Sequence, residues 1–292
     1  MSLLDTVGNT PLLKFEFPNG TLWGKAEFLN PGGSVKDRPV AWILKQAIRT
    51  KKLKPGDTIV EATSGNMGIS LAMFSANLGF KCIIVMPSNM STERKVMLKS
   101  FGAELIEVPA GDFDGAILLR NKLAKDNGWF NFNQFHNPLN IESHWYTTGN
   151  EIIKDIPFNT CIDAFVAGTG TGGTIMGAGK FIKGKCPVCK LVALEPAESP
   201  VMSGGEPGLH GIQGIGDGSK FLVDLNDIDR IETVSTEKSI EKSKSLAKDY
   251  GLFVGFSAAA NFLVAENLIS EGYAKNIVTI LCDRGERYFS CL

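Results

Sequence analysis

Short apolar runs alternate along the chain with longer segments in which apolar positions recur at the spacing of a helix face. The runs lack polar alternation, which is typical of strands buried on both faces of a sheet. Predicted strands lie at 58–61, 82–86, 104–108, 164–167, 191–194 and 277–281, and predicted helices at 68–78, 92–101, 114–126, 174–183, 236–250 and 258–269. This alternation predicts an α/β fold of strand–helix–strand units, with parallel sheets covered by helices on both faces.

Two stretches interrupt the alternation. Asn-Pro-Leu-Asn at 137–140 separates two groups of strand–helix units and indicates a soft domain boundary. Residues 195–229 are rich in Gly and Pro and have little periodicity. A segment of that length in a compact domain is usually functional, and we expect its glycine cluster at 204–218 to form a lid.

Composition and charge limit the classes of partner. The chain has 30 Lys+Arg against 31 Asp+Glu, a formal charge of −1, which argues against nucleic acid as a main partner. The N-terminus lacks a signal-peptide pattern and no apolar run could cross a bilayer, so we expect no membrane partner and a cytoplasmic location. Cys186-x-x-Cys189 has no second Cys pair and no nearby His, so no metal site is predicted. His136, His144 and His210 are scattered without metal spacing, and we expect them to support loops rather than to take part in catalysis.

Glycine is over-represented, and two of its clusters have the composition of anion-binding loops. Gly makes up 32 of 292 residues, about 11% against a usual ~7%. Residues 59–68 run from a strand through Thr, Ser, Gly and Asn into a helix, and residues 166–174 run through Gly-Thr-Gly-Thr-Gly-Gly-Thr into another. Backbone N–H groups and the helix dipole at such connections bind phosphates or carboxylates. The second loop has the Gly-x-Gly-x-x-Gly spacing with Glu195 about 22 residues on, but Pro196 does not continue a dinucleotide-binding unit.

A lysine follows a third glycine turn, in Asn-Pro-Gly-Gly-Ser-Val-Lys-Asp-Arg at 30–38. A single lysine is usually a solvated surface charge. At such a turn, however, Lys36 could be desolvated and form a Schiff base with an aldehyde. A nucleophilic lysine, a phosphate cradle and a carboxylate cradle together are what pyridoxal phosphate chemistry on amino acids requires.

These motifs, with Glu-Pro-Ala-Glu-Ser-Pro-Val at 195–201, resemble the cysteine synthase family. That family is the O-acetylserine sulfhydrylase and cystathionine β-synthase branch of the fold type II pyridoxal phosphate enzymes. The match runs from Thr-Val-Gly-Asn-Thr-Pro-Leu at 6–12 to the segment 282–288, whose sequence is similar to the B-type cysteine synthases. The resemblance implies two doubly wound domains with mostly parallel sheets: a smaller one of residues 36–138, and a larger one of 1–35 plus 139–292 that carries the phosphate cradle.

The resemblance also implies a role for individual residues. Lys36 would form the internal aldimine and move the α-proton, Asn66 would contact the 3′ oxygen of pyridoxal 5′-phosphate, and Ser257 would bind its ring nitrogen. The phosphate would be held by Gly170, Thr171, Gly172, Gly173 and Thr174. The substrate would be bound by Thr63, Ser64, Gly65, Met67, Gln134 and Gly216. The implied reaction is β-replacement through an α-aminoacrylate, cysteine synthesis from O-acetylserine and sulfide, in a homodimer.

Three positions depart from the family pattern. Met67 stands where the family usually has Thr, which removes a hydroxyl from the carboxylate loop, although backbone N–H groups can still bind there. Ser257-Ala258-Ala259 replaces Ser-Ser-Gly and keeps the first hydroxyl. Asp217, in Gly-Ile-Gly-Asp-Gly, replaces a small apolar residue.

Asp217 leaves the nucleophile open. A carboxylate near the substrate β-carbon would repel hydrosulfide but could deprotonate water, so that cysteine and water would give serine and hydrogen sulfide. Alternatively, Asp217 caps a turn in the surface lid, a common role for Asp between glycines. Two further alternatives are a protein that binds the cofactor but acts as a partner or regulator, and a serine or threonine dehydratase, which lacks motif support beyond the shared fold.

Overall fold

The computed structural model describes residues 2–63 and 65–291, which form two compact units. The smaller unit contains residues 2–7 and 36–139, and the larger unit contains residues 8–35 and 140–291. This division differs from the predicted one at the N-terminus, where residues 2–7 belong to the smaller unit. The reason is that Leu4 is buried in the same apolar cluster as Val40 and Leu44 of that unit.

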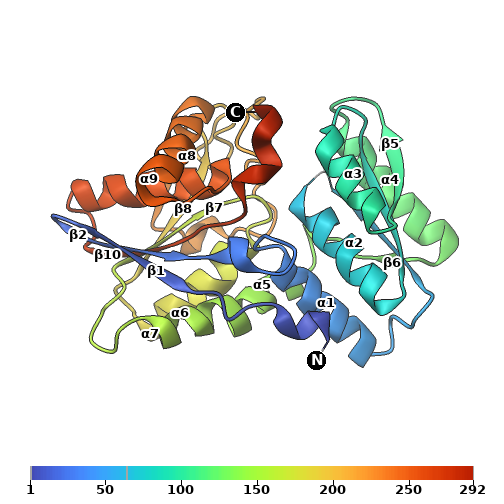
Figure 1. The fold of residues 1–292 in the computed structure, drawn as a ribbon, viewed down its shortest axis with the longest axis horizontal. Coiled ribbons are helices and arrows are strands. Elements are labelled where there is room, and N and C mark those ends of the chain that lie inside the picture. Colours follow the sequence, from blue (N-terminus) through green and yellow to red (C-terminus); the bar gives the residue numbers. More distant parts are fainter. Residues whose placement is uncertain (1, 64, 292) are drawn as a thin grey trace. The chain divides into compact units, whose positions relative to one another are not determined.

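The smaller unit contains a four-stranded parallel sheet in the order β5-β4-β3-β6. Its outer strands, β5 and β6, are labelled in Figure 1. Its elements are η1 (Leu3–Thr6), α1 (Asp37–Arg49), β3 (Thr58–Ala62), α2 (Asn66–Leu78), β4 (Lys81–Pro87), α3 (Thr92–Ser100), β5 (Glu104–Val108), α4 (Phe113–Asn127) and β6 (Phe130–Asn131). Helix α4 begins where the Asp112 side chain accepts a hydrogen bond from the Gly115 N–H at 2.8 Å, and it ends at Gly128, whose φ is +66°. Both are ordinary helix signals that position the following strand.

Alternating residues of the central strands explain the unbroken apolar runs. Ile59 and Ile84 lie in one apolar cluster, whereas their neighbours Val60 and Val85 lie in another. Successive side chains of a strand point to opposite faces, so a sheet with helices on both faces needs apolar residues at every position.

The larger unit contains a six-stranded sheet in the order β1-β2-β10-β7-β8-β9, in which only β1 and β2 pair antiparallel. Its elements are β1 (Leu12–Phe17), β2 (Gly20–Lys25), η2 (Glu27–Leu29), α5 (Leu139–Ser143), η3 (His144–Gly149), α6 (Asn150–Asp155), β7 (Ala164–Gly168), η4 (Ile175–Gly179), α7 (Lys180–Lys185), β8 (Lys190–Pro196), η5 (Leu225–Asp227), β9 (Arg230–Val234), α8 (Thr236–Tyr250), α9 (Phe256–Ser270), β10 (Asn276–Ile280) and η6 (Gly285–Cys291). The α/β fold with mostly parallel sheets is therefore confirmed. Among the described residues, no helix has both the length and the apolar character that a membrane crossing requires.

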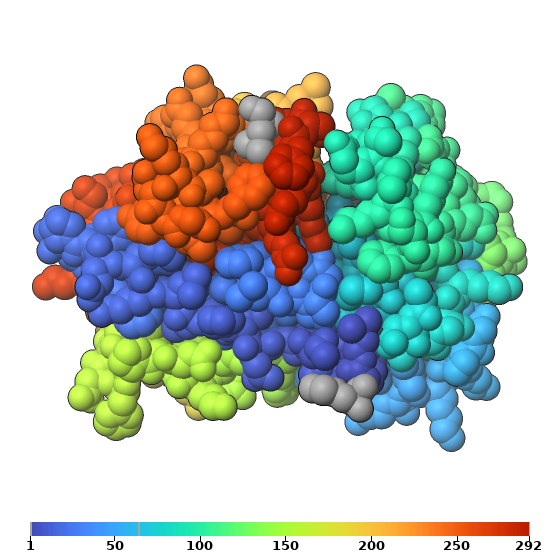
Figure 2. Space-filling model, in the orientation of Figure 1, coloured from blue at the N-terminus to red at the C-terminus, as the bar shows by residue number. Residues whose placement is uncertain are grey.

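The β1–β2 hairpin was not among the predicted strands. Its inner residues pack against the helices of the C-terminal half: Phe15 meets Phe262 of α9 edge-on, with ring centroids 5.0 Å apart, and Leu22 is buried in the same cluster. Figure 2 shows this association on the surface, where the N-terminal strands (blue) lie against the later helices (orange). The hairpin thus forms one edge of the larger sheet.

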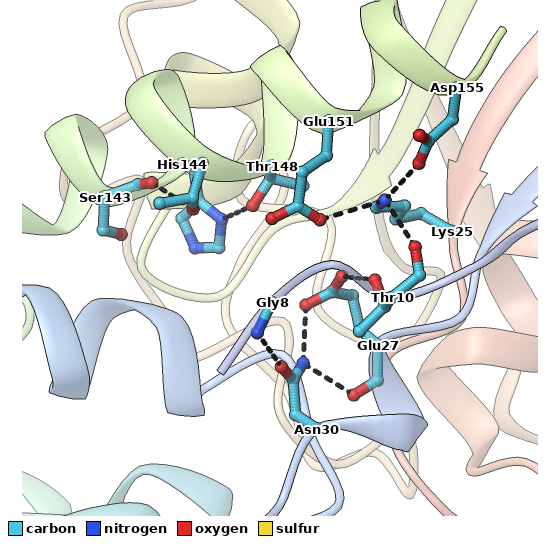
Figure 3. Close-up of polar contacts among 11 residues, drawn as sticks. Gly8, Thr10, Lys25, Glu27, Asn30, Ser143, His144, Thr148, Glu151 and Asp155 are labelled. Atoms are coloured by element: carbon cyan, nitrogen blue, oxygen red, sulfur yellow. Dashed lines mark hydrogen bonds and ion pairs between the residues drawn. The ribbon is translucent and has the colours of Figure 1, made fainter. Parts of the chain in front are cut away.

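A buried lysine joins this hairpin to α6. Lys25 is fully buried, and its Nζ lies 2.6 Å from the Thr10 carbonyl oxygen and 3.0 Å from carboxylate oxygens of both Glu151 and Asp155 (Figure 3). A buried ammonium is tolerated only when it is paired and hydrogen-bonded, and these three partners meet that need.

Candidate functional site

Lys36 directly precedes α1, and a buried bond ties the start of this helix to α2. The Asp37 side chain is fully buried and accepts a hydrogen bond from the Ser70 hydroxyl. Ser70 lies one helical turn after Asn66, the first residue of α2. This bond therefore links the start of α1, next to Lys36, to α2 one turn after Asn66.

The loop before Lys36 is fixed within the larger unit. Asn30 donates to Glu27 Oε2 at 2.8 Å and accepts from the Gly8 N–H at 2.9 Å (Figure 3). Gly33 has φ +75°, which requires glycine, and the Val35 N–H donates to a backbone carbonyl oxygen 2.8 Å away. The turn is thus specified by its own sequence, Asn-Pro-Gly-Gly-Ser-Val.

The predicted carboxylate loop joins the end of β3 to the start of α2. Thr63 is buried, and its Oγ1 accepts from the Gly65 N–H at 3.3 Å. Gly65, the N-cap of α2, has no side chain with which to cap the helix, and the positive end of the helix dipole faces this loop. Met67 is only 2% exposed and lies in the apolar core, so only its backbone is suited to bind an anion. Ser64 lies outside the described residues.

Gln134 lies beside this loop, in the segment after β6. Its backbone N–H donates to Glu61 Oε2 at 2.9 Å, and its side-chain Nε2 donates to the Ala62 carbonyl oxygen at 3.4 Å. Burial raises the pKa of the Glu61 carboxyl, while Arg120 and two backbone N–H groups oppose that rise by stabilising the anion. Gln134, far from Thr63 and Gly65 in the sequence, is thus brought beside their loop within the smaller unit.

The glycine-rich loop of the larger unit follows β7 and leads into an unbroken helical run of residues 173–185. A Cβ atom at Gly173 would lie 2.1 Å from Asn140 Oδ1, and one at Gly170 would lie 2.6 Å from the Gly214 carbonyl oxygen. Gly172 has φ +85°. Side chains cannot fit at these positions, so the loop presents bare backbone, as phosphate-binding loops do.

Three side chains that the sequence analysis did not single out as site residues support this loop. Asn261 accepts from the Gly168 N–H at 2.7 Å, and Asn140 donates to Thr171 Oγ1 at 3.0 Å. His144 Nε2 lies 3.4 Å from Thr174 Oγ1. His144 is therefore a buried helical residue that contacts the loop. The spacing of Asn140 and His144, four residues apart on one helical face, was the available signal.

Ser257 lies in the first turn of α9 and is 4% exposed. The preceding Gly255 donates its N–H to the Asp283 carbonyl oxygen at 3.0 Å, and a Cβ there would lie 2.2 Å from Asp283 Oδ1. The Asp283 carboxylate also accepts from the Tyr288 hydroxyl. The C-terminal motif that resembled the B-type enzymes therefore supports the helix start that carries Ser257.

Asp217 is exposed and lies against the glycine-rich loop. A Cβ at Gly170 would be 3.1 Å from Asp217 Oδ2, and the Gly216 N–H donates to the Thr169 carbonyl oxygen at 2.9 Å. His210 Nε2 lies 3.1 Å from the Gly216 carbonyl oxygen, which holds the turn from its other side. The irregular segment 195–229 thus contacts the glycine-rich loop near Asp217.

Glu195, which has the spacing of a ribose-binding acid, instead accepts hydrogen bonds from the backbone of its own chain. Its carboxylate accepts the Met202 N–H at 2.7 Å and the Ser203 N–H at 2.9 Å. The carboxylate is buried and anchors the start of the segment that leads to Asp217.

The described residues among those predicted therefore divide between the two units. The smaller unit holds Lys36, Thr63, Gly65, Asn66, Met67 and Gln134, and the larger unit holds Gly170, Thr171, Gly172, Gly173, Thr174, Gly216, Asp217 and Ser257. The first group has the donors for a carboxylate, and the second has those for a phosphate.

Comparison with known proteins identifies the same chemistry. The family model described as pyridoxal-phosphate dependent enzyme matches residues 3–283. The chain is 42% identical to a cysteine synthase from Staphylococcus aureus, over 99% of this chain and 95% of that protein. It is 43% identical to cysteine synthase B from Campylobacter jejuni, over 98% and 96%. A solved hydrogen sulfide-producing enzyme from Fusobacterium nucleatum is 40% identical with a TM-score of 0.93, covering 99% of this chain and 90% of that one.

Proposed function

Because the chain belongs to the family of pyridoxal-phosphate dependent enzymes, we propose that it catalyses β-replacement on an amino-acid donor. Its main reaction is the synthesis of cysteine from O-acetylserine and sulfide, consistent with relatives named cysteine synthase. The proposal rests on the glycine-rich loop, whose backbone is not covered by side chains at Gly170, Gly172 and Gly173 and leads directly into a helix. The same chain also contains Lys36 and a loop suited to bind a carboxylate.

The residues present fit pyridoxal 5′-phosphate. The phosphate needs several backbone N–H donors in a small space, and the crowding at Gly170 and Gly173 supports such a close backbone approach. The loop residues Gly170 to Thr174 would hold the phosphate, Asn66 the 3′ oxygen, and Ser257 the ring nitrogen. Lys36 would hold the aldehyde carbon.

When bound, the cofactor withdraws electrons from the α-carbon of the donor, so that the α-proton becomes acidic. Lys36 would take that proton. Thr63, Ser64, Gln134 and the backbone N–H groups of Gly65 and Met67 would orient the donor by its carboxylate, and Gly216 would contact it from the lid segment. This orientation brings the α-proton to one base rather than to water.

Ser257 directs the outcome of proton removal. A neutral hydroxyl cannot stabilise a protonated ring nitrogen as a carboxylate does, so electron withdrawal is weaker than in an enzyme with an acid at this place. Weaker withdrawal favours expulsion of a leaving group from the β-carbon over transamination.

The proposal is tested by supplying O-acetylserine, O-phosphoserine, serine and cysteine separately to the cofactor-loaded enzyme. Absorbance reports binding, and chromatography after addition of sulfide reports cysteine. Cysteine formed fastest from O-acetylserine supports the proposal, and no product from any donor contradicts it. A cofactor spectrum that responds to none of the four amino acids would favour the partner-binding alternative, which the presence of Lys36, Asn66 and Ser257 argues against.

A second candidate is the release of hydrogen sulfide from cysteine. It is favoured by the position of Asp217 beside Gly170 and by likeness to a hydrogen sulfide-producing enzyme. In this reaction the C–S bond of cysteine breaks, a C–O bond to water forms, and the water proton leaves through Asp217 with the sulfide. Net, cysteine and water become serine and hydrogen sulfide.

Replacing Gly170 by alanine is expected to weaken cofactor binding by about tenfold, because the new methyl would displace the Gly214 carbonyl and the loop with it. Titration of the apoenzyme with pyridoxal 5′-phosphate measures the change. Gly184→Ala is the matched control, since a Cβ at that exposed helical position meets no atom within 4 Å. Equal affinity of both variants would refute a phosphate-binding role for the loop.

We further propose a cytoplasmic homodimer, on the family resemblance. The six cysteines, which are all free thiols, are consistent with a reducing compartment. Light scattering at micromolar protein concentration would distinguish a dimer from a monomer.

A further inference from the structure

Glu61 and Arg120 form a fully buried ion pair in the smaller unit. Arg120 Nη1 lies 2.7 Å from Glu61 Oε1, and the two side chains are 1% and 0% exposed. Glu61 is the penultimate residue of β3, and Arg120 lies in the middle of α4. Removing two charges from water is costly, and apolar residues of similar size often stabilise a core equally well. The pair therefore calls for a role beyond stability.

The contacts of the pair lie on the two segments assigned to the substrate carboxylate. Glu61 Oε1 accepts the Ala62 N–H at 2.7 Å, directly before Thr63, and Glu61 Oε2 accepts the Gln134 N–H at 2.9 Å. The second terminal nitrogen of the Arg120 guanidinium, Nη2, donates to Asn133 Oδ1 at 3.2 Å.

The backbone conformation of Asn133 shows why the Glu61–Arg120 pair and its contacts, here called the clamp, are needed. Its φ is +55°, in the left-handed region that an L-residue adopts at a cost. The following Gln134 is turned back toward β3, where its side chain reaches the Ala62 carbonyl oxygen. A turn held in this conformation persists only when surrounding contacts specify it.

We propose that the Glu61–Arg120 pair is a positioning device that holds Gln134 and the Thr63 loop in the register required to bind the donor carboxylate. The inference rests on the proposed function, which assigns both segments to that carboxylate. Only a carboxylate can accept two backbone N–H groups from different segments and still pair with a guanidinium. Apolar residues would fill the same volume without aligning the segments.

The double variant Glu61→Leu/Arg120→Met distinguishes an effect on the stability of the protein from an effect on the position of Gln134 and the Thr63 loop. Single variants leave one buried charge unpaired and are expected to unfold readily. The double variant removes both charges, so it should melt well above either single variant, although below wild type because the Ala62 and Gln134 N–H groups lose their acceptor. Its apparent affinity for L-alanine, which has no β leaving group, should nevertheless fall about tenfold, and the KM of the donor should rise by the same factor with little change in kcat.

Two measurements complete the test. Hydrogen exchange at the Gln134 amide should be faster in the stable double variant, and this readout requires no turnover. The control is Lys25→Met, which disrupts a buried ion pair of the larger unit (Figure 3) and should lower stability without changing L-alanine affinity.

A stable double variant with wild-type L-alanine affinity and unchanged exchange at Gln134 would overturn the inference. Failure of the proposed function gives a different result, because the wild-type enzyme would then form no cysteine from any donor while amide exchange still reports on the clamp.

Discussion

Replacing Lys36 by alanine is expected to reduce turnover by at least about 10³-fold with every donor. In the proposed mechanism Lys36 both holds the cofactor and moves the α-proton, so its loss removes two functions at once. Its place before α1 is set by the buried Asp37–Ser70 bond, which an alanine at position 36 leaves intact. The variant should therefore fold normally and fail in chemistry.

The control is Lys45→Ala, on the same helix, where the side chain is 46% exposed and pairs with Asp5 at 3.3 Å. A surface pair of this kind contributes little, and turnover should be unchanged. Borohydride reduction followed by peptide mass spectrometry should place the cofactor mass on Lys36 in wild type. Cofactor mass on another lysine, or activity retained in Lys36→Ala, would assign the role elsewhere.

Much of the fold could be predicted from local pattern alone. The run Lys-Cys-Ile-Ile-Val-Met-Pro reads as a strand because β4 is buried on both faces, and the structure extends the predicted 82–86 by only one residue at each end. β1 and β2 were missed because β1 is half-buried with a mixed pattern and β2 begins and nearly ends with glycine. β9 was missed because Arg-Ile-Glu-Thr-Val, at a sheet edge, has only its last residue buried.

The candidate site could also be predicted only in part: its loops were predicted, but the residues that support them were not. Loops such as 168–174 carry their function in contiguous residues, so motif and spacing were sufficient to propose them. Their supports were not predictable, since Glu61 and Arg120 are 59 positions apart and Gly168 and Asn261 are 93 apart. Neither pair leaves a local signal, because each contact arises only when the sheet and its helices are assembled.

Replacing Asp217 by asparagine is expected to move two activities in opposite directions. Sulfide release from cysteine should fall by about 100-fold, because asparagine cannot accept the proton of water. Cysteine synthesis from O-acetylserine and sulfide should be retained or should rise, because removing the negative charge removes its repulsion of hydrosulfide. A general loss of structure would lower both rates, so opposite signs identify a chemical role.

The turn that carries Asp217 is held by the Gly216–Thr169 and His210–Gly216 hydrogen bonds, neither of which involves the Asp217 side chain. Asparagine has nearly the size and shape of aspartate, so Asp217→Asn should keep the loop in place. Glu206→Gln, an exposed acid in the same segment, is the matched control and should leave both rates unchanged. If sulfide release is unchanged in Asp217→Asn, the carboxylate does not act on water and cysteine synthesis stands as the reaction. If release falls while synthesis is retained, Asp217 selects water as the nucleophile, and one exposed carboxylate against the phosphate loop determines whether the same scaffold makes cysteine or consumes it.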